Sequence, residues 1–182
     1  AHVPGLRVVM PATASDARDL FIASVLCDDP AVFIDDRWLY EEEAELGDIA
    51  PVVLRAVHPR LLRKGTDLTL VGTGFGTAMC RRAADLADEI SCEVIDVPVI
   101  NPMEDADWAV LRDSHARTGR LLVVDGAWGN CGWAASVVAA VGGRALTLPA
   151  SPAPTSGGLE ADFYESVSAE SVVAAAREMC VE

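Results

Sequence analysis

A short, wholly apolar run near the middle of the chain, residues 121–124 (Leu-Leu-Val-Val), constrains the fold more than any other feature. A glycine-rich polar segment, residues 125–132, follows it, and the spacing of apolar residues then becomes helical. Such a run is typical of a parallel strand that is covered on both faces. Open α/β sheets place their functional surface at the carboxyl ends of these strands. We therefore predict a buried strand that ends in a turn, residues 125–133, at the functional edge of a sheet.

Segments with strand-like and helix-like spacing alternate along the rest of the chain. This alternation predicts an α/β fold with a three-layer, doubly wound, mostly parallel sheet of Rossmann-like type. Residues 1–35 have the order strand, helix, strand, which predicts a right-handed βαβ unit. Strands are predicted at residues 6–10, 31–34, 68–71, 92–97, 121–124 and 145–148, an extended piece at 52–62, a loop at 149–158, and helices after residues 13, 76, 101, 132 and 168.

Capping residues mark several of the expected helix ends. Thr13 is predicted to cap the first helix, with Asp16 reaching back to it in a capping box. Residues 101–104 (Asn-Pro-Met-Glu) predict a helix start, with asparagine at the cap, proline at the first position and glutamate at the third. Gly119 and the pair Gly142-Gly143 are predicted to end helices, and Ser168 is predicted to cap the last one.

The alternation is interrupted at residues 36–51. This segment carries the acidic run Glu41-Glu42-Glu43, the apolar residues Trp38 to Tyr40, and the turn residues Gly47 and Pro51. It is interpreted as a surface connection and as the best place for a domain boundary. We therefore predict two parts, residues 1–50 and residues 51–182.

The charge balance excludes some classes of partner. The chain has 14 Lys and Arg against 28 Asp and Glu, a formal charge of -14. Nucleic-acid binding and docking on anionic membranes both depend on cationic side chains, so neither is expected. No stretch is long and apolar enough to cross a bilayer, and no signal peptide opens the chain. The abrupt entry from His2 into a strand predicts a fragment or a processed piece.

The cysteines and histidines show no metal-binding spacing. The five cysteines have no C-x-x-C pair, and there are only three histidines. Reduced thiols, packed mostly as small hydrophobic side chains, are expected, and with them a cytoplasmic location. Cys131 precedes an expected helix, which could lower the pKa of its thiol, but an inert thiol is the preferred interpretation. Trp128 and Trp133 flank the glycine-rich turn, where they could form an interdomain contact surface or pack in the core, and we weigh the two roles equally.

Familiar catalytic and nucleotide-binding motifs are incomplete. Residues 72–76 (Gly-Thr-Gly-Phe-Gly) follow a strand, but Thr77 stands where the dinucleotide fingerprint needs glycine. Asp96 ends the next strand, where a ribose-binding acid would lie, yet a tight turn without a ligand is preferred. There is no G-x-S-x-G nucleophile motif, and Asp113 and His115 do not face each other on a helix. We predict no catalytic residue and no cofactor-binding residue in this chain.

An ordered series of short segments nevertheless resembles one family. The series resembles the beta subunit of thiamine-diphosphate-dependent 2-oxo-acid dehydrogenases, whose wider relatives are transketolase and deoxyxylulose-phosphate synthase. No single segment is specific, but their order spans essentially the whole chain. The segments are residues 2–11, 16–17, 29–30, 39–40, 65–67, 93–96, 101–103, 117–120, 123–124, 126–132, 152–154 and 159–160.

The resemblance implies a division of labour. Residues 1–50 would be the tail of a pyrimidine-binding domain with its connector, and residues 51–182 a transketolase-like C-terminal domain. The family's activating glutamate and active-site histidine lie before the segment that matches residue 1. Its alpha subunit holds thiamine diphosphate and Mg²⁺, so this chain alone would bind neither. Some members also bind K⁺ through main-chain carbonyls, and the matching positions are Ser24, Cys27 and Asp29.

The resemblance therefore predicts part of an oxidoreductase that decarboxylates a 2-oxo acid and transfers the acyl group to lipoamide. This chain would contribute to assembly with an alpha subunit or an upstream pyrimidine-binding domain. It would also help to dock the lipoyl-bearing acyltransferase and form a homo-oligomer. Two alternatives stay open: the end of a transketolase-like enzyme that does not use lipoamide, and a non-catalytic dimerisation module. The sequence does not identify the 2-oxo acid or the oligomeric state.

Overall fold

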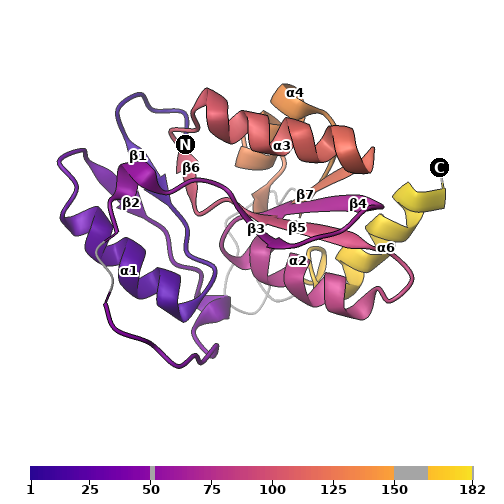
Figure 1. Cartoon of the computed structure of the whole chain (residues 1–182), viewed down its shortest axis with the longest axis horizontal. Coiled ribbons are helices and arrows are strands. Elements are labelled where there is room, and N and C mark those ends of the chain that lie inside the picture. The colour runs from indigo at the N-terminus through magenta and orange to yellow at the C-terminus, as the bar shows by residue number, and fades with distance from the viewer. Residues whose placement is uncertain (50–51, 150–163, 182) are drawn as a thin grey trace.

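The computed structural model describes residues 1–49, 52–149 and 164–181, which form two sheets with helices packed on them (Figure 1). The strands are β1 (Arg7–Val9), β2 (Ala31–Phe33), β3 (Arg60–Arg63), β4 (Leu68–Gly72), β5 (Cys92–Asp96), β6 (Val99–Asn101), β7 (Leu121–Trp128) and β8 (Arg144–Leu148). The helices are α1 (Ala14–Val25), α2 (Phe75–Leu86), α3 (Asp105–Thr118), α4 (Trp133–Val141) and α6 (Ala169–Val181), with short 3-10 turns at η1 (Arg37–Leu39) and η2 (Leu54–Ala56).

The larger sheet has the strand order β3-β5-β4-β7-β8, in which only β3 runs antiparallel to its neighbour. Its central strands β4 and β5 are buried along their whole length. Helices α3 and α4 cover one face, and α2 and α6 cover the other (Figure 1). The predicted three-layer, mostly parallel α/β sheet is therefore confirmed.

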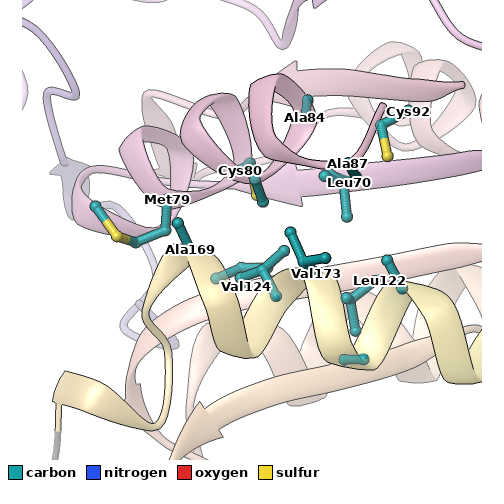
Figure 2. Close-up of a cluster of buried hydrophobic side chains, with 14 of the residues drawn as sticks. Leu70, Met79, Cys80, Ala84, Ala87, Cys92, Leu122, Val124, Ala169 and Val173 are labelled. Atoms are coloured by element: carbon teal, nitrogen blue, oxygen red, sulfur yellow. The ribbon is translucent and has the colours of Figure 1, made fainter. Parts of the chain in front are cut away.

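The main core lies between this sheet and the helices α2 and α6. Figure 2 shows side chains of α2 and α6 pointing toward Leu70, Leu122 and Val124 of the sheet. Small residues, such as Ala84 of α2 and Ala87 at its C-cap, let the layers approach closely. Successive strand residues point to opposite faces, so Val71 and Val123 belong to the second cluster, under α3 and α4. Burial on both faces is why these strands are continuously apolar.

The smaller sheet has the order β2-β1-β6. Strands β1 and β2 are parallel and are connected through α1, as the strand–helix–strand order predicted. Strand β6 comes from the later part of the chain and pairs antiparallel with β1. The division at residues 50 and 51 stays a prediction, because both residues lie outside the described ranges.

The predicted helix start at Asn101 is wrong. Asn101 ends β6, and its side-chain amide donates to the carbonyl oxygens of Val3 (3.2 Å) and Leu6. The helix begins at Asp105 instead, where Glu104 is the cap and Asp107 bonds back to it in a capping box. The local capping signal was overridden because residues 99–101 gain backbone pairing with β1.

Other local predictions are confirmed or refined. Thr13 caps α1, but the Asp16 carboxylate accepts a bond from the Thr13 hydroxyl (2.8 Å) instead of its backbone. Residues 52–62 are not one extended piece, since η2 interrupts them before β3 begins. Strand β7 continues to Trp128, through part of the predicted turn. Gly119 and Gly142 are helix C-caps, as predicted. The Ser168 hydroxyl accepts a hydrogen bond from the backbone N–H of Ser171. The loop predicted at residues 149–158 lies outside the described residues from residue 150 on.

Candidate functional site

The carboxyl ends of β4 and β7 lie side by side and face the smaller sheet. Gly72 pairs with Val124, so the next residues, Thr73 and Asp125, emerge together at this edge. A cavity of about 420 Å³ opens there, between the two sheets. Its walls come from both parts of the chain, with Ile34 on one side and Phe75 on the other. The sheet edge predicted from residues 125–133 therefore does form a concave site.

Asp125 organises this edge. Its side chain is buried, and its two carboxylate oxygens accept bonds from the backbone N–H groups of Ala127 (3.2 Å) and Ala134 (3.0 Å). One carboxylate thus holds both the irregular end of β7 and the first turn of α4. Burial raises the pKa of Asp125, and the two backbone hydrogen bonds oppose that rise.

Two further residues of the cavity wall, Thr73 and Trp133, carry buried polar atoms that have no hydrogen-bond partner among the described residues. Thr73 is 1% exposed and Trp133 is 7% exposed. Within residues 1–49, 52–149 and 164–181, neither the Thr73 hydroxyl nor the Trp133 indole N–H makes a hydrogen bond. The structure also separates the two tryptophans that the sequence treated alike, since Trp133 is buried whereas Trp128 is 42% exposed.

An aromatic cluster closes one side of the cavity. The Tyr164 ring lies 5.0 Å from Phe75, edge to face, and 5.3 Å from Trp38. Its hydroxyl donates to the Asp36 carboxylate (3.2 Å). The predicted connector is therefore anchored to the C-terminal part of the chain. Sequence reasoning missed this cluster because 128 residues separate its bonded partners.

A second polar cluster ties α1 to the larger sheet. Arg60 donates to both carboxylate oxygens of Asp16, at 2.8 and 2.9 Å, and also to Asp96. Asp96 is fully buried, and its other oxygen accepts from the Thr77 hydroxyl (2.7 Å). Burial raises the pKa of Asp96, and the neighbouring guanidinium of Arg60 opposes that rise. The pKa of Arg60 is in turn raised by its hydrogen bonds to the carboxylates of Asp16 and Asp96. Sequence reasoning missed Arg60, although an acid at the end of an apolar strand needs such a partner.

Residues 58–178 match the family described as the transketolase C-terminal domain. The chain belongs to the transketolase C-terminal domain family. Its larger sheet, α2, α3, α4 and most of α6 all fall inside the matched residues. The beginning of the chain, with β1, α1 and β2, lies outside them.

Curated relatives of this family member confirm the resemblance to beta subunits. The chain is 32% identical to the mitochondrial 2-oxoisovalerate dehydrogenase subunit beta of Dictyostelium discoideum, over 77% of this chain and 38% of the relative. It is 39% identical to the pyruvate dehydrogenase E1 component subunit beta of Rhizobium meliloti, over 69% of this chain and 27% of the relative. The chain therefore spans well under half the length of these relatives.

Solved structures show the same fold. A split-gene transketolase, described as an inactive beta4 tetramer, has a TM-score of 0.73 at 19% identity. The match covers 99% of this chain and 58% of the transketolase chain. Transketolase from Campylobacter jejuni has a TM-score of 0.61 at 16% identity, and the match covers 93% of this chain and 26% of that transketolase chain. The similarity extends beyond the transketolase C-terminal domain into the smaller sheet.

In this transketolase C-terminal domain Gly72 and Gly76 serve close packing, whereas Gly74 adopts a positive φ of 50°. A Cβ atom on Gly76 would lie well inside 3.0 Å of the Val124 carbonyl oxygen, and one on Gly72 would also lie inside 3.0 Å of the backbone nitrogen of Thr77. Asp96, the candidate ribose-binding acid, is occupied by Arg60 and Thr77. These contacts favour the tight turn over nucleotide binding.

The cysteines show the expected packing. All five are free thiols. Burial raises the pKa of Cys92 to about 11 and also raises that of Cys80, so both are protonated near neutral pH. Cys131 is exposed at the rim of the cavity, with a backbone φ of 61°. Among the described residues, no helix has the length and apolar character needed to cross a membrane.

The three residues proposed for K⁺ lie together at the end of α1, outside the matched transketolase C-terminal domain. Ser24 donates its hydroxyl to the Leu20 carbonyl oxygen (2.7 Å). The Asp29 carboxylate is held by Arg7 (2.8 Å) and Arg55 (2.9 Å), which lower its pKa. The side chains of Ser24 and Asp29 are thus already engaged, so only main-chain oxygens of Ser24, Cys27 and Asp29 are suited to an ion.

Proposed function

We propose that this chain is the C-terminal portion of the beta subunit of a thiamine-diphosphate-dependent 2-oxo-acid dehydrogenase. The observation that carries the proposal is the similarity to several such beta subunits over 69–89% of this chain, together with the transketolase C-terminal domain at residues 58–178. The assembled enzyme would release CO₂ from a 2-oxo acid and transfer the acyl group to a lipoyl arm. This chain would supply assembly contacts and docking, and no reacting group.

The surface supports a role in assembly. Strand β2 is at the edge of its sheet, where unpaired backbone groups can accept another strand. Beside it, Phe21 of α1 packs against Phe33 yet stays 54% exposed, and Val25 and Leu26 are 69% and 76% exposed. Clustered exposed apolar side chains are typical of protein interfaces. We propose that the alpha subunit or an upstream pyrimidine-binding domain covers this face, and that residues 50 and 51 mark the domain boundary.

The residues around the cavity do not fit the diphosphate of the cofactor. Asp35, Asp36 and Asp125 line it against the single guanidinium of Arg37 among the described lining side chains. Within the described parts of the chain, no three His, Cys, Asp or Glu side chains form a metal site. We therefore propose that thiamine diphosphate and Mg²⁺ are held by other parts of the assembled enzyme.

Reconstitution tests this function. The chain is purified alone and also within the complete beta subunit assembled with its alpha subunit. Thiamine diphosphate binding is measured by calorimetry, and CO₂ release from pyruvate and 2-oxoisovalerate is assayed. We expect binding and turnover in the assembly only, with turnover raised by a lipoylated acceptor protein and not by sugar phosphates. Decarboxylation by the isolated chain would contradict the proposal, and transfer to a sugar phosphate alone would favour the transketolase-like alternative.

A K⁺ ion bound by the main-chain oxygens of Ser24, Cys27 and Asp29 is a further part of this proposal. The end of a helix leaves its last carbonyl groups without helical partners, which suits a hard cation. At a K⁺ concentration ten times its dissociation constant, the assembled enzyme should gain about 1.4 kcal/mol. Melting temperatures in KCl, NaCl and choline chloride at equal ionic strength measure this gain. Identical values in all three salts would refute the site, and Cys27→Ser is the control that should change nothing.

Two wider properties are also proposed. The five free thiols support a cytoplasmic location, and the exposed apolar side chains of α1 support a homo-oligomer. Light scattering of the assembled enzyme and fractionation of cells with an antibody to this chain would test them. A beta subunit present once per assembly would contradict the homo-oligomer. Recovery of the chain only in an organelle would contradict the cytoplasmic location.

A further inference from the structure

Strand β3, at one edge of the larger sheet, has exposed apolar side chains. Among the described strands β3 pairs only with β5, so the backbone N–H and C=O groups that point the other way have no strand partner. Leu61 and Leu62 of β3 are 48% and 42% exposed. At the opposite edge, Leu148 of β8 is buried. β3 is therefore the edge of this sheet that still has apolar surface to cover.

The surroundings of β3 are basic, although the chain has a formal charge of -14. Residues 52–66 contain no Asp or Glu, and they contain four basic side chains: Arg55, Arg60, Arg63 and Lys64. Arg81 of α2 adds another, because it lines the same cavity of about 370 Å³ as Leu62. Neither Lys64 nor Arg81 forms an ion pair with any described residue. Two β3 strands would therefore repel each other, and the bulge in β3 also opposes such pairing, whereas an acidic strand would be attracted.

The acidic segment of the connector, residues 41–49, carries the complementary charge. It contains five Asp and Glu and no Lys or Arg, and all of its residues are exposed. It belongs to no helix or strand, and its Leu46 side chain is 49% exposed. Arg82 binds its beginning and Arg18 donates to backbone carbonyl oxygens near its end. Glu45, between these anchors, forms no ion pair with a described residue, so the middle of the acidic segment is free to bind.

Antiparallel alignment brings the charges of β3 and the acidic segment together. The alignment is set by placing Leu46 opposite Leu62. It then gives two facing ion pairs: Arg63 with Glu45, and Arg60 with Asp48. A parallel alignment on the same leucines gives only one. Opposite charges and apolar side chains that face each other across strands stabilise a sheet. Figure 1 shows the acidic segment on the α1 side of the molecule, apart from β3 of its own chain, so a second copy must supply it.

We propose that β3 binds the acidic segment of a second copy of this chain as an added antiparallel strand, with Arg63 facing Glu45. Addition of an extended segment to an open sheet edge is a recurring mode of recognition, in which backbone hydrogen bonds give affinity and side chains give specificity. A twofold axis would let each copy give its acidic segment to the other, so that both contacts form together. The contact uses other residues than the exposed apolar face of α1, and it does not depend on the reaction of the assembled enzyme.

A labelled peptide tests the edge of β3. The receptor is the full chain with Glu45→Arg, whose own acidic segment should no longer compete. A fluorescein-labelled peptide of residues 41–49 is titrated with this receptor, and binding is followed by fluorescence anisotropy. We expect saturable binding that weakens as the salt concentration rises and that is about ten-fold or more tighter than binding of a peptide with the same composition in scrambled order. Equal binding of the two peptides would reflect net charge alone and would overturn the proposal.

Charge reversal tests the pairing between two copies. Sedimentation equilibrium is measured for the full chain, for Arg63→Glu, for Glu45→Arg and for the variant that carries both changes. We expect a dimer whose dissociation constant rises about ten-fold or more in each single variant and largely recovers in the double variant, where the pair is exchanged. Val110→Asp, at an exposed position of α3, should leave the dimer unchanged. The melting temperatures should agree closely, because the pair that Arg63 forms with Asp85 is exposed.

The state of the unmodified chain decides whether a second copy is the occupant. A chain that stays monomeric would overturn the proposal, and peptide binding to β3 would then point to an acidic strand of another protein. A dimer that neither charge variant weakens would be formed by another surface, such as the exposed apolar face of α1, and would also overturn it. Either failure would leave the reconstitution result, and so the proposed function, untouched.

Discussion

Replacing Arg60 by alanine is expected to lower the free energy of unfolding by about 2–4 kcal/mol. Arg60 donates to the fully buried carboxylate of Asp96 and to both oxygens of Asp16. Its removal leaves a buried charge without its counter-charge, which typically costs about 3–5 kcal/mol. The expected range is lower because the Arg60 side chain is 40% exposed, so solvent screens part of the interaction. Urea unfolding followed by circular dichroism measures the change.

Two controls make this result specific to the buried pair. Arg63→Ala breaks an exposed pair with Asp85, whose side chains are 45% and 78% exposed, and should cost at most about 1 kcal/mol. Adding Asp96→Asn to the Arg60→Ala variant should restore part of the loss, because a neutral amide is cheaper to bury than an unpaired carboxylate. A loss for Arg60→Ala no larger than that for Arg63→Ala would show that the cluster does not hold α1 to the larger sheet.

Replacing Gly76 by alanine is expected to lower the free energy of unfolding by about 3 kcal/mol or more, or to prevent soluble expression. Gly76 lies in the first turn of α2, directly over Val124 in the middle of β7. The added Cβ would fall well inside 3.0 Å of the Val124 carbonyl oxygen, which is main chain and cannot turn away as a side chain does. The helix must therefore move away from the sheet, although alanine by itself favours a helix by about 1 kcal/mol over glycine.

The comparison with Gly47→Ala separates crowding from any general effect of losing a glycine. A Cβ atom on Gly47 would meet nothing within 4 Å, and its backbone φ is not in the left-handed region. This variant should change stability by less than about 0.5 kcal/mol. Thermal unfolding of both proteins decides the matter. A melting temperature for Gly76→Ala within a degree or two of the parent protein would show that α2 and β7 do not need this close approach.

These two residues also show where sequence reasoning stopped. The sequence predicts that Gly76 belongs to a tight, glycine-rich turn after a strand. Which atom it approaches was not visible, because Val124 lies 48 residues further along the chain. No sequence pattern points to Arg60, since its partners Asp16 and Asp96 are 44 and 36 residues away. A buried carboxylate at the end of a strand indicates that a cationic side chain must lie nearby, but the sequence does not show which one.

The cavity follows the same pattern. The sequence predicted that residues 125–133 lie at a functional edge, and the structure places Asp125 and Trp133 there. It did not connect them with Thr73, with Asp36 of the expected connector, or with Tyr164. These side chains meet because neighbouring strands end together and the smaller sheet packs across that edge. The K⁺ positions Ser24, Cys27 and Asp29 came from family resemblance, and they stay a proposal.

The sequence by itself determined most of the elements and their order. The period of apolar residues reports how much of each segment is buried, and caps such as Thr13, Gly119 and Ser168 act within a few residues. Only the tertiary structure decided that residues 99–101 pair with β1 instead of starting a helix, that Trp133 is buried while Trp128 is exposed, and that Arg60 meets Asp96. These outcomes depend on contacts between residues far apart in the chain. Their energies exceed the local preferences, and they exist only once the layers have packed.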